Sequence, residues 1–316
     1  MAIPHAPILT VTPNPALDVS TSVDRVVPEH KMRCGPSRLD PGGGGVNVSR
    51  VVRNLGGRSL ALYTAGGPTG AAYRELLERE GVAGRVIRIG ESTRESFTVD
   101  ETGSGEQFRF VLQGPRLSEP EWRLLLNAVA DDLPTGGFVI PSGSVPPGAP
   151  ADLYARIARI AGENDVRCIV DASGDALRAA LDEGVFLIKP SARELGELVG
   201  APVDDEAALV DAGRRLVSTG GCEVVALTLG GAGAVLVTAD EALRLPAADV
   251  AVRSTVGAGD SFLGGLVLRL AQGRSLRDAF RTGVAAGAAS AALPATELGD
   301  ADAVAALERD LEPVAI

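Results

Sequence analysis

Aromatic side chains and positive charge are scarce in this sequence of 316 residues. Phe, Trp and Tyr make up 3% of it, so aliphatic residues must fill the core, which is typical of parallel strands buried on both faces. The formal net charge of −11 excludes a general nucleic-acid or anionic-membrane binder, because such proteins need a basic face. A small anionic ligand stays open, since a few local cations and aligned amides can overcome the average field.

Cysteine and histidine are also rare. The three cysteines and two histidines have no disulfide or metal-ligand spacing, which favours reduced thiols in a cytosolic protein. The opening residues, MAIPHAPILTVTPN, lack the basic and apolar regions of a signal peptide, and no later segment is apolar enough to span a bilayer. We therefore expect a cytoplasmic protein with no membrane partner.

Apolar periodicity predicts strands that alternate with helices. Strands are expected at residues 8–11, 59–64, 137–140, 166–170, 186–188 and 223–229. Helices are expected at residues 48–55, 69–80, 122–129, 151–161, 192–198, 206–218, 259–271 and 276–293. This alternation predicts an α/β fold, a three-layer sandwich around a mostly parallel central sheet, formed by one domain over residues 1–316.

Two stretches interrupt the alternation. Residues 32–39 and 96–112 are β-rich, and the second contains a polar turn at residues 101–106. They resemble antiparallel hairpin strands rather than βα units. We therefore expect a small β-sheet lid, with its strands within residues 18–40 and 94–113.

The string STVGAGDS at residues 254–261 carries the strongest chemical signal, because it opens a predicted helix. Gly257 and Gly259 allow backbone torsions forbidden to other residues, so several amides can converge on one anion, aided by the helix N-terminus. A carboxylate there repels phosphate, which makes sense if Asp260 takes a proton from an attacking hydroxyl. Alternatively, Asp260 only caps the helix.

Three further glycine-rich or polar strings follow predicted strands or begin helices. PGGGGVN at residues 41–47 suits a polyhydroxylated ligand, or is a flexible turn. KPSARE at residues 189–194 lies at the ligand edge of the sheet, where Lys189 could meet phosphate and Glu194 could hold Mg²⁺ through water, or forms an ordinary cap. LTLGGAG at residues 227–233 suits a nucleotide.

Two common nucleotide sites are excluded. A β-like run rather than a helix follows LTLGGAG, so the context of a dinucleotide fingerprint fails. The GxxxxGK[ST] string of the P-loop is absent as well. If the protein binds ATP, its nucleotide site must therefore be of a different type.

These four strings, in this order, resemble the ribokinase-like (PfkB) family of carbohydrate kinases over essentially the whole chain. Within the family, the sequence looks most like the minor bacterial ATP-dependent 6-phosphofructokinases. Supporting strings are KMRC at 31–34, GEQFRFV at 105–111, SGSVPPG at 142–148 and DASG at 171–174. The resemblance implies a central sheet with a β lid, and a homodimer in which two lids clasp.

The resemblance also implies roles for individual residues. At the sugar end it assigns the hydroxyls to Asp18, Gly43 and Asn47, and the phosphate to Arg94 and Ser144, with Lys31 reaching across from a partner subunit. At the nucleotide end it assigns ATP to Lys189, Thr228, Gly230 and Gly233, and Mg²⁺, through water, to Glu194. At the reaction centre it assigns the anion hole to Gly257, Ala258 and Gly259, and the catalytic base to Asp260.

The activity implied is ATP-dependent phosphorylation of fructose 6-phosphate to fructose 1,6-bisphosphate. The alternatives are 1-phosphofructokinase, tagatose-6-phosphate kinase and, more remotely, a non-catalytic sugar or nucleotide sensor. Two departures matter: Ser191 stands where the family usually has Asn, so weaker metal organisation is expected. Residues 293–297, LPATE, depart from the loop that often helps bind potassium, which puts activation by a monovalent cation in doubt.

Overall fold

The computed structural model describes residues 4–203 and 205–316. Its main sheet has ten strands in the order β14-β13-β12-β11-β10-β9-β8-β1-β4-β5. Seven neighbouring strands, from β11 to β5, pair in parallel, and β12, β13 and β14 add an antiparallel edge. The strands are β1 (Ile8–Thr12), β4 (Leu60–Ala65), β5 (Ala83–Arg88), β8 (Phe138–Pro141), β9 (Arg167–Val170), β10 (Val185–Ile188), β11 (Cys222–Thr228), β12 (Ala234–Val237), β13 (Ala242–Leu245) and β14 (Val314–Ala315).

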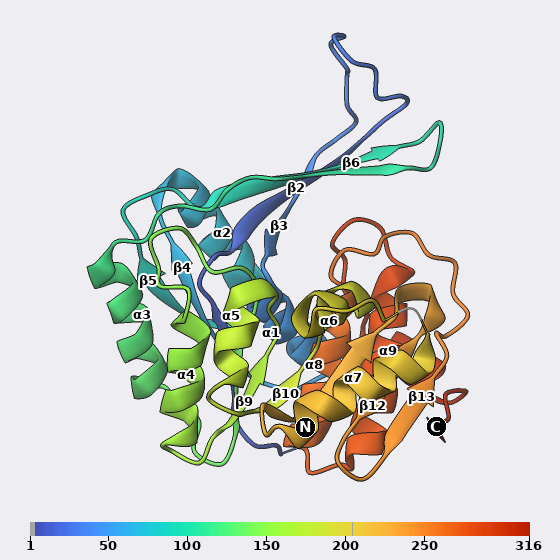
Figure 1. The fold of residues 1–316 in the computed structure, drawn as a ribbon. Coiled ribbons are helices and arrows are strands. Elements are labelled where there is room, and N and C mark those ends of the chain that lie inside the picture. Colours follow the sequence, from blue (N-terminus) through green and yellow to red (C-terminus); the bar gives the residue numbers. More distant parts are fainter. Residues whose placement is uncertain (1–3, 204) are drawn as a thin grey trace.

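Helices cover both faces of this sheet, which gives three layers (Figure 1). On one face lie α3 (Glu119–Asp131), α4 (Leu153–Gly162), α5 (Gly174–Leu181), α6 (Ala192–Val199) and α7 (Glu206–Ser218). On the other lie α1 (Gly44–Asn54), α8 (Ala258–Ala271), α9 (Leu276–Ala291) and α10 (Ala301–Glu308). Helix α2 (Gly67–Arg79) packs near β4, and a short 3₁₀ helix, η1 (Gly230–Ala232), follows β11.

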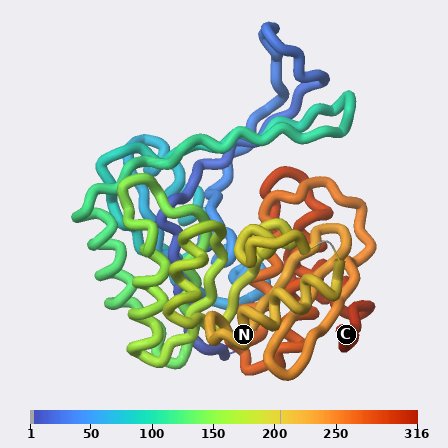
Figure 2. The backbone as a smooth tube through the Cα atoms, in the orientation of Figure 1, coloured from blue at the N-terminus to red at the C-terminus, as the bar shows by residue number. Residues whose placement is uncertain are grey.

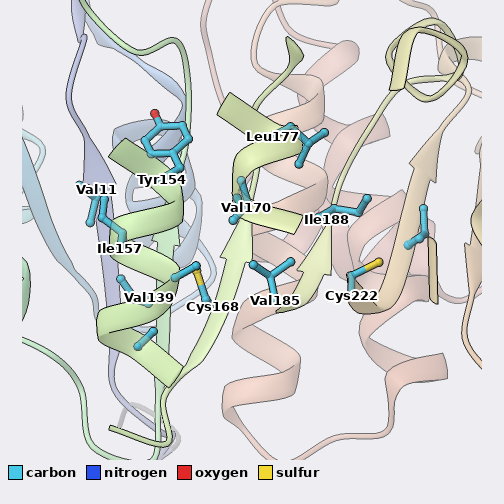
Figure 3. Packing of buried hydrophobic residues seen from close by; sticks show 14 of the residues in the cluster. Val11, Val139, Tyr154, Ile157, Cys168, Val170, Leu177, Val185, Ile188 and Cys222 are labelled. Atoms are coloured by element: carbon cyan, nitrogen blue, oxygen red, sulfur yellow. The ribbon is translucent and has the colours of Figure 1, made fainter. Parts of the chain in front are cut away.

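The core between the layers is aliphatic, as the composition predicted. Val11, Val139 and Val170 from the strands pack against Ile157 and Leu177 from α4 and α5, and all five are at most 1% exposed (Figure 3). At about 25 cal/mol per Å² of apolar surface removed from water, such strands gain most of their stability from burial on both faces. The fold class predicted from the sequence is confirmed.

A second, smaller sheet stands beyond the ends of the main strands (Figure 1). It has the order β3-β2-β6-β7, formed by β2 (Ala16–Val23), β3 (Arg38–Gly42), β6 (Arg94–Glu101) and β7 (Gln107–Val111). The hairpin of β6 and β7 is antiparallel, whereas β2 and β6 pair in parallel. The expected strand over residues 32–39 is wrong for residues 32–37, which form irregular structure in an exposed segment that projects from the chain (Figure 2).

Several other elements differ from the expected ones. Strand β5 and helix α5 were not predicted, because the apolar residues of AGRVIR do not alternate with its two arginines and α5 has only 8 residues. Helix α8 begins at Ala258, one residue earlier than expected. Among the described residues, none of the helices is both long and apolar enough to cross a membrane.

Candidate active site

A cavity of about 720 Å³ lies where the ends of the main strands face the small sheet. Its lining draws on β2 and β6 from the small sheet, and on the segments after β8, β9 and β10 from the main sheet. The ends of parallel strands are where α/β sheets bind ligands. Nine of the predicted site residues line it: Asp18, Gly43, Asn47, Arg94, Ser144, Lys189, Glu194, Gly257 and Asp260.

The N-terminus of α8 forms one wall of the cavity. Gly257 precedes the helix with a φ of 75°, in the left-handed region that favours glycine. The backbone N–H groups of Gly257, Gly259 and Asp260 have no hydrogen-bond partner among the described residues, whereas the Ala258 N–H points to the Thr255 carbonyl at 3.4 Å. Three free amides at a helix start can bind an anion.

Gly259 does not need the unusual torsion that the sequence suggested, because it has ordinary helical geometry. Its small size matters instead. A Cβ atom at this position would lie 3.2 Å from the Nζ atom of Lys189. Glycine therefore leaves room for the ammonium group beside the start of α8.

Asp260 is held by one hydrogen bond from a side chain. The Asn47 Nδ2 atom donates to its Oδ2 atom at 2.8 Å. Burial raises the pKa of Asp260, and the charge of Asp171 raises it further, while Asn47, Lys189 and Arg109 oppose the rise. A carboxylate with a raised pKa beside free amides can accept a proton next to a bound anion.

Lys189 lies just after β10 and pairs with Asp171, which follows the neighbouring strand β9. The Nζ atom is 3.1 Å from an Asp171 carboxylate oxygen, and the Lys189 side chain is 9% exposed. Burial lowers the pKa of Lys189, but the charges of Asp171, Asp260 and Glu194 outweigh burial and raise it. Asp171 belongs to the DASG string that supports the resemblance, but no role was predicted for it, because its contact with Lys189 joins two strands and leaves no local pattern.

The small sheet supplies the opposite wall through Asp18 on β2 and Arg94 at the start of β6. Burial raises the pKa of Asp18 to about 7, although Arg94 lowers it. The Arg94 guanidinium donates to the backbone carbonyls of Leu112 at 3.2 Å and Asn14 at 3.0 Å. Arg109 on β7 also lines the cavity and was missed, since an Arg in a hairpin strand is usually solvated.

Ser144 lies in the loop after β8, and Asn14 anchors it. The Asn14 Nδ2 atom donates to the Ser144 hydroxyl at 2.8 Å. Asn14 is 6% exposed, and its Oδ1 atom has no hydrogen-bond partner within the described part of the chain. Asn14 was also missed, because the Thr-Pro-Asn-Pro string containing it reads as a turn after β1.

Other predicted residues lie outside this cavity. Lys31 is exposed in the irregular segment between β2 and β3. Thr228 ends β11, where its N–H donates to the Pro190 carbonyl at 3.1 Å, and Gly230 and Gly233 border η1. Ala258 and Gly259 belong to the first turn of α8 behind Gly257. Within one chain, the cavity thus brings Asp260 together with the predicted sugar-binding residues other than Lys31. The predicted nucleotide residues Thr228, Gly230 and Gly233 do not line it.

The residues around Glu194 can accommodate a hydrated Mg²⁺ ion. Glu194 lines the cavity, and its Oε2 atom accepts bonds from the Ser191 N–H and hydroxyl, both at 2.8 Å. Its Oε1 atom has no protein partner in residues 4–203 and 205–316. A single carboxylate with one oxygen facing the cavity side suits Mg²⁺, because this ion keeps several waters and uses one or two carboxylates plus phosphates.

Comparison with known proteins identifies the family. The sequence pattern of the pfkB family carbohydrate kinases matches residues 15–300. The chain belongs to the PfkB family. This PfkB chain is 45% identical to an ATP-dependent 6-phosphofructokinase isozyme 2 of Mycobacterium tuberculosis, over 94% of this chain and 87% of the relative. It is 35% identical to a 1-phosphofructokinase of Borreliella burgdorferi, over 90% and 91% of the two chains.

A solved structure of a PfkB relative has the same fold. The phosphofructokinase-2 of Escherichia coli, in complex with fructose-6-phosphate, matches with a TM-score of 0.91 and 35% identity, over 96% of this chain and 98% of that one. The predicted resemblance to PfkB carbohydrate kinases is therefore confirmed, and with it the class of enzyme, a phosphotransferase that acts on a sugar hydroxyl.

Proposed function

We propose that this protein transfers the γ-phosphoryl group of ATP to the C1 hydroxyl of fructose 6-phosphate. One observation carries the proposal: the Asp260 carboxylate and three amides that have no partner among the described residues lie together at the start of α8, beside the cavity. An anion hole next to a base with a raised pKa suits phosphoryl transfer to an alcohol, which relies on positioning and electrostatics.

The reaction centre follows from these groups. The hydroxyl oxygen of C1 attacks the γ-phosphorus in line, the bond from that phosphorus to the bridging oxygen breaks, and ADP leaves. Asp260 accepts the hydroxyl proton. The N–H groups of Gly257, Gly259 and Asp260 stabilise the negative charge that develops on the transferred group. Of the predicted anion hole, Ala258 contributes least, because its N–H points to Thr255.

The sugar phosphate would bind between the small sheet, the start of α1 and the loop after β8. Asp18, Gly43 and Asn47 would hold the sugar hydroxyls, and Arg94 and Ser144 the 6-phosphate. Arg94 is already oriented by two backbone carbonyls, so little freedom is lost when it binds a phosphate. Arg109, which also lines the cavity, adds positive charge on this side.

The nucleotide would extend from the anion hole towards β11. Lys189 would contact its phosphates, and Thr228, Gly230 and Gly233 would border the nucleoside. Glu194 would hold Mg²⁺ through water, and the ion would neutralise charge on the phosphates. The raised pKa of Lys189 supports this role, because it keeps the ammonium group charged.

Two copies of the chain would associate through their small sheets. Leu39 on β3 and Phe110 on β7 are 44% and 52% exposed. The strand register places both in one row across the sheet with Val19 and Phe97, so they share a face. Exposed apolar side chains on one face of a sheet suit an interface. In such a homodimer Lys31 would reach the partner's cavity, and sedimentation equilibrium would give twice the chain mass of 32.3 kDa. We also propose a cytoplasmic location, where ATP is available.

A second candidate is 1-phosphofructokinase, because a relative of that name is 35% identical; tagatose-6-phosphate kinase and a non-catalytic sensor remain as further alternatives. An ADP-release assay with fructose 6-phosphate, fructose 1-phosphate, tagatose 6-phosphate and unphosphorylated sugars separates all four. We expect the highest kcat/KM with fructose 6-phosphate. A preference for another sugar would overturn the substrate assignment, and no ADP release with any sugar would overturn the enzyme.

A further inference from the structure

A buried arginine lies behind the hydrogen bond that holds Asp260. Arg50 is 5% exposed and stands three residues after Asn47 on α1, so both side chains leave the same face of the helix. Its Nη1 atom donates to the Asn47 Oδ1 atom at 3.1 Å, and Asn47 Nδ2 donates to Asp260 Oδ2 at 2.8 Å. The three side chains therefore form one line of contacts that ends at the carboxylate.

The guanidinium of Arg50 is fixed from its other side. Its Nε and Nη2 atoms donate to the two carboxylate oxygens of Glu80, at 2.6 and 2.8 Å. The Asp40 Oδ1 atom lies 3.7 Å from Nη2, and the Pro41 carbonyl lies 3.5 Å from Nη1. A forked pair of this kind holds a guanidinium in one plane, and the two carboxylates compensate for burying its charge.

This arrangement decides which way the Asn47 amide faces. Arginine has five N–H donors and no acceptor, so only the amide oxygen can face it. The amide nitrogen must then face Asp260. If Asn47 turned by half a rotation, its oxygen would repel the ionised carboxylate and would accept a bond from the protonated one.

We propose that Arg50 is a positioning residue for the base: by fixing the Asn47 amide, it holds Oδ2 of Asp260 and leaves Oδ1 to accept the substrate proton. The proposal rests on the proposed function, in which Asp260 is that base. Among the described residues, Oδ1 of Asp260 has no hydrogen-bond partner. The alternative is that Arg50 only ties α1 to Glu80 at the end of α2, with no effect on the reaction.

A set of variants separates these alternatives. Arg50→Gln supplies an acceptor, which permits the Asn47 amide to turn, whereas Arg50→Lys keeps a cationic donor without an acceptor. Arg53→Gln is the matched control, because Arg53 lies on the same helix but is exposed and donates to the Gly81 carbonyl. Should Arg50→Gln fold poorly because Glu80 loses its partner, the double variant Arg50→Gln/Glu80→Gln removes both charges together.

We expect Arg50→Gln to lower kcat about ten- to a hundred-fold, as misplaced catalytic groups do. Arg50→Lys should recover part of this loss, and Arg53→Gln should match the wild type. Folded Arg50→Gln protein, or the folded double variant, with the wild-type kcat would overturn the proposal. Equal losses in Arg50→Lys and Arg50→Gln would also count against it, since the amide orientation would then not matter.

The pH profile of kcat distinguishes an effect of the Asn47 amide orientation from an effect of the Arg50 charge. The groups that face Asp260 are Asn47 on α1, Asp171 after β9, Lys189 after β10 and Arg109 on β7. Losing the Asn47 donor raises the pKa of Asp260, so the acid limb should move to higher pH in Arg50→Gln and in the double variant. If Arg50 acted through its charge alone, the double variant would return to the wild-type limb, which would overturn the proposal.

A readout without turnover keeps this test independent of the substrate. The side-chain amide of Asn47 gives two ¹H–¹⁵N signals, identified by their loss in Asn47→Asp. Arg50→Gln should shift them and speed their hydrogen exchange, whereas Arg53→Gln should leave them unchanged. Unchanged signals in Arg50→Gln would overturn the positioning role. A wild-type protein inactive on every sugar would instead overturn the proposed function, while these signals would still report the contact.

Discussion

The cavity has a carboxylate at each end, and the two are supported in opposite ways. Asp18, on the small sheet, accepts no hydrogen bond from another described residue and has arginines as its nearest cations. Asp260, at the start of α8, accepts a bond from Asn47, which Arg50 orients in turn. One carboxylate is therefore free to adapt, and the other is held in place.

This difference matches the work expected at each end. Preorganisation helps most where charge moves during the reaction, because fixed dipoles need no reorganisation at that moment. A substrate that enters and leaves needs partners whose hydrogen bonds are still open. Burial raises the pKa of both carboxylates, which means that it disfavours their ionised forms. A ligand that donates a hydrogen bond to either carboxylate can therefore stabilise it.

Removing the held carboxylate should have the largest effect. Asp260→Asn keeps the size of the side chain but cannot accept the hydroxyl proton, so kcat should fall by about two to four orders of magnitude. The KM for either substrate should change little. Steady-state kinetics at saturating ATP and sugar phosphate measures this, with circular dichroism to verify folding. A folded variant with near wild-type turnover would remove Asp260 from its role.

Removing the cation at the other end should affect binding rather than turnover. Arg94→Ala should raise the KM for the sugar phosphate roughly ten- to a hundred-fold, since a hydrogen bond to a charged group contributes about 1.5–3 kcal/mol. The KM for ATP should stay nearly constant. Arg94→Lys is the matched control, and its KM for the sugar phosphate should lie between those of the wild type and Arg94→Ala. Equal rises in the KM for the sugar phosphate and the KM for ATP would contradict a role of Arg94 in binding the sugar phosphate alone.

The sequence could predict the end of the cavity where local pattern and chemistry coincide. A glycine-framed Asp at the start of a predicted helix indicates either an anion site with a base or a helix cap, and long aliphatic runs indicate buried parallel strands. Contacts between distant positions leave no such signal. Arg50 meets Glu80 thirty residues away, and Lys189 meets Asp171 only because β9 and β10 are neighbours.

The small sheet was harder to predict for a related reason. Its strands come from two parts of the chain, and β2 pairs with β6 in parallel across 78 residues, from Ala16 to Arg94. Few residues of β2, β6 and β7 are fully buried on either face, so their polar and apolar residues do not alternate cleanly. Residues 32–37 looked like a strand from composition, but they lack a neighbouring strand to complete the hydrogen bonds.

The pH dependence of stability should show that Asp18 is buried without a hydrogen-bond donor among the described residues. The pKa of Asp18 rises from 3.8 to about 7 on folding, so the unfolded chain loses this proton first. Its contribution to stability is therefore fully present below pH 3.8, declines as the pH rises, and is lost above about pH 7. Asp18→Asn has no carboxyl group to ionise, so this loss of stability with rising pH should disappear.

The difference in Tm between Asp18→Asn and the wild type should thus be small near pH 4 and largest above pH 7. Differential scanning fluorimetry across this range measures it. Asp24→Asn is a suitable control, because Asp24 is an exposed carboxylate just after β2. A difference that is constant with pH would mean that Asp18 does not titrate in this range.

The smallest expected effect concerns the metal, through the residue that departs from the family pattern. Ser191 caps α6 and bonds to Glu194, the carboxylate proposed to hold Mg²⁺ through water. Asn caps helices as well as Ser does, so Ser191→Asn should leave Tm unchanged, while its longer amide adds a partner for the metal-bound waters. One such bond is worth about 0.5 kcal/mol, which predicts a roughly two- to three-fold lower apparent KM for Mg²⁺. A magnesium titration of turnover measures this, and Ser191→Ala should shift it in the other direction. If both variants titrate like the wild type, position 191 does not contact the hydrated ion, and Glu194 must organise it alone.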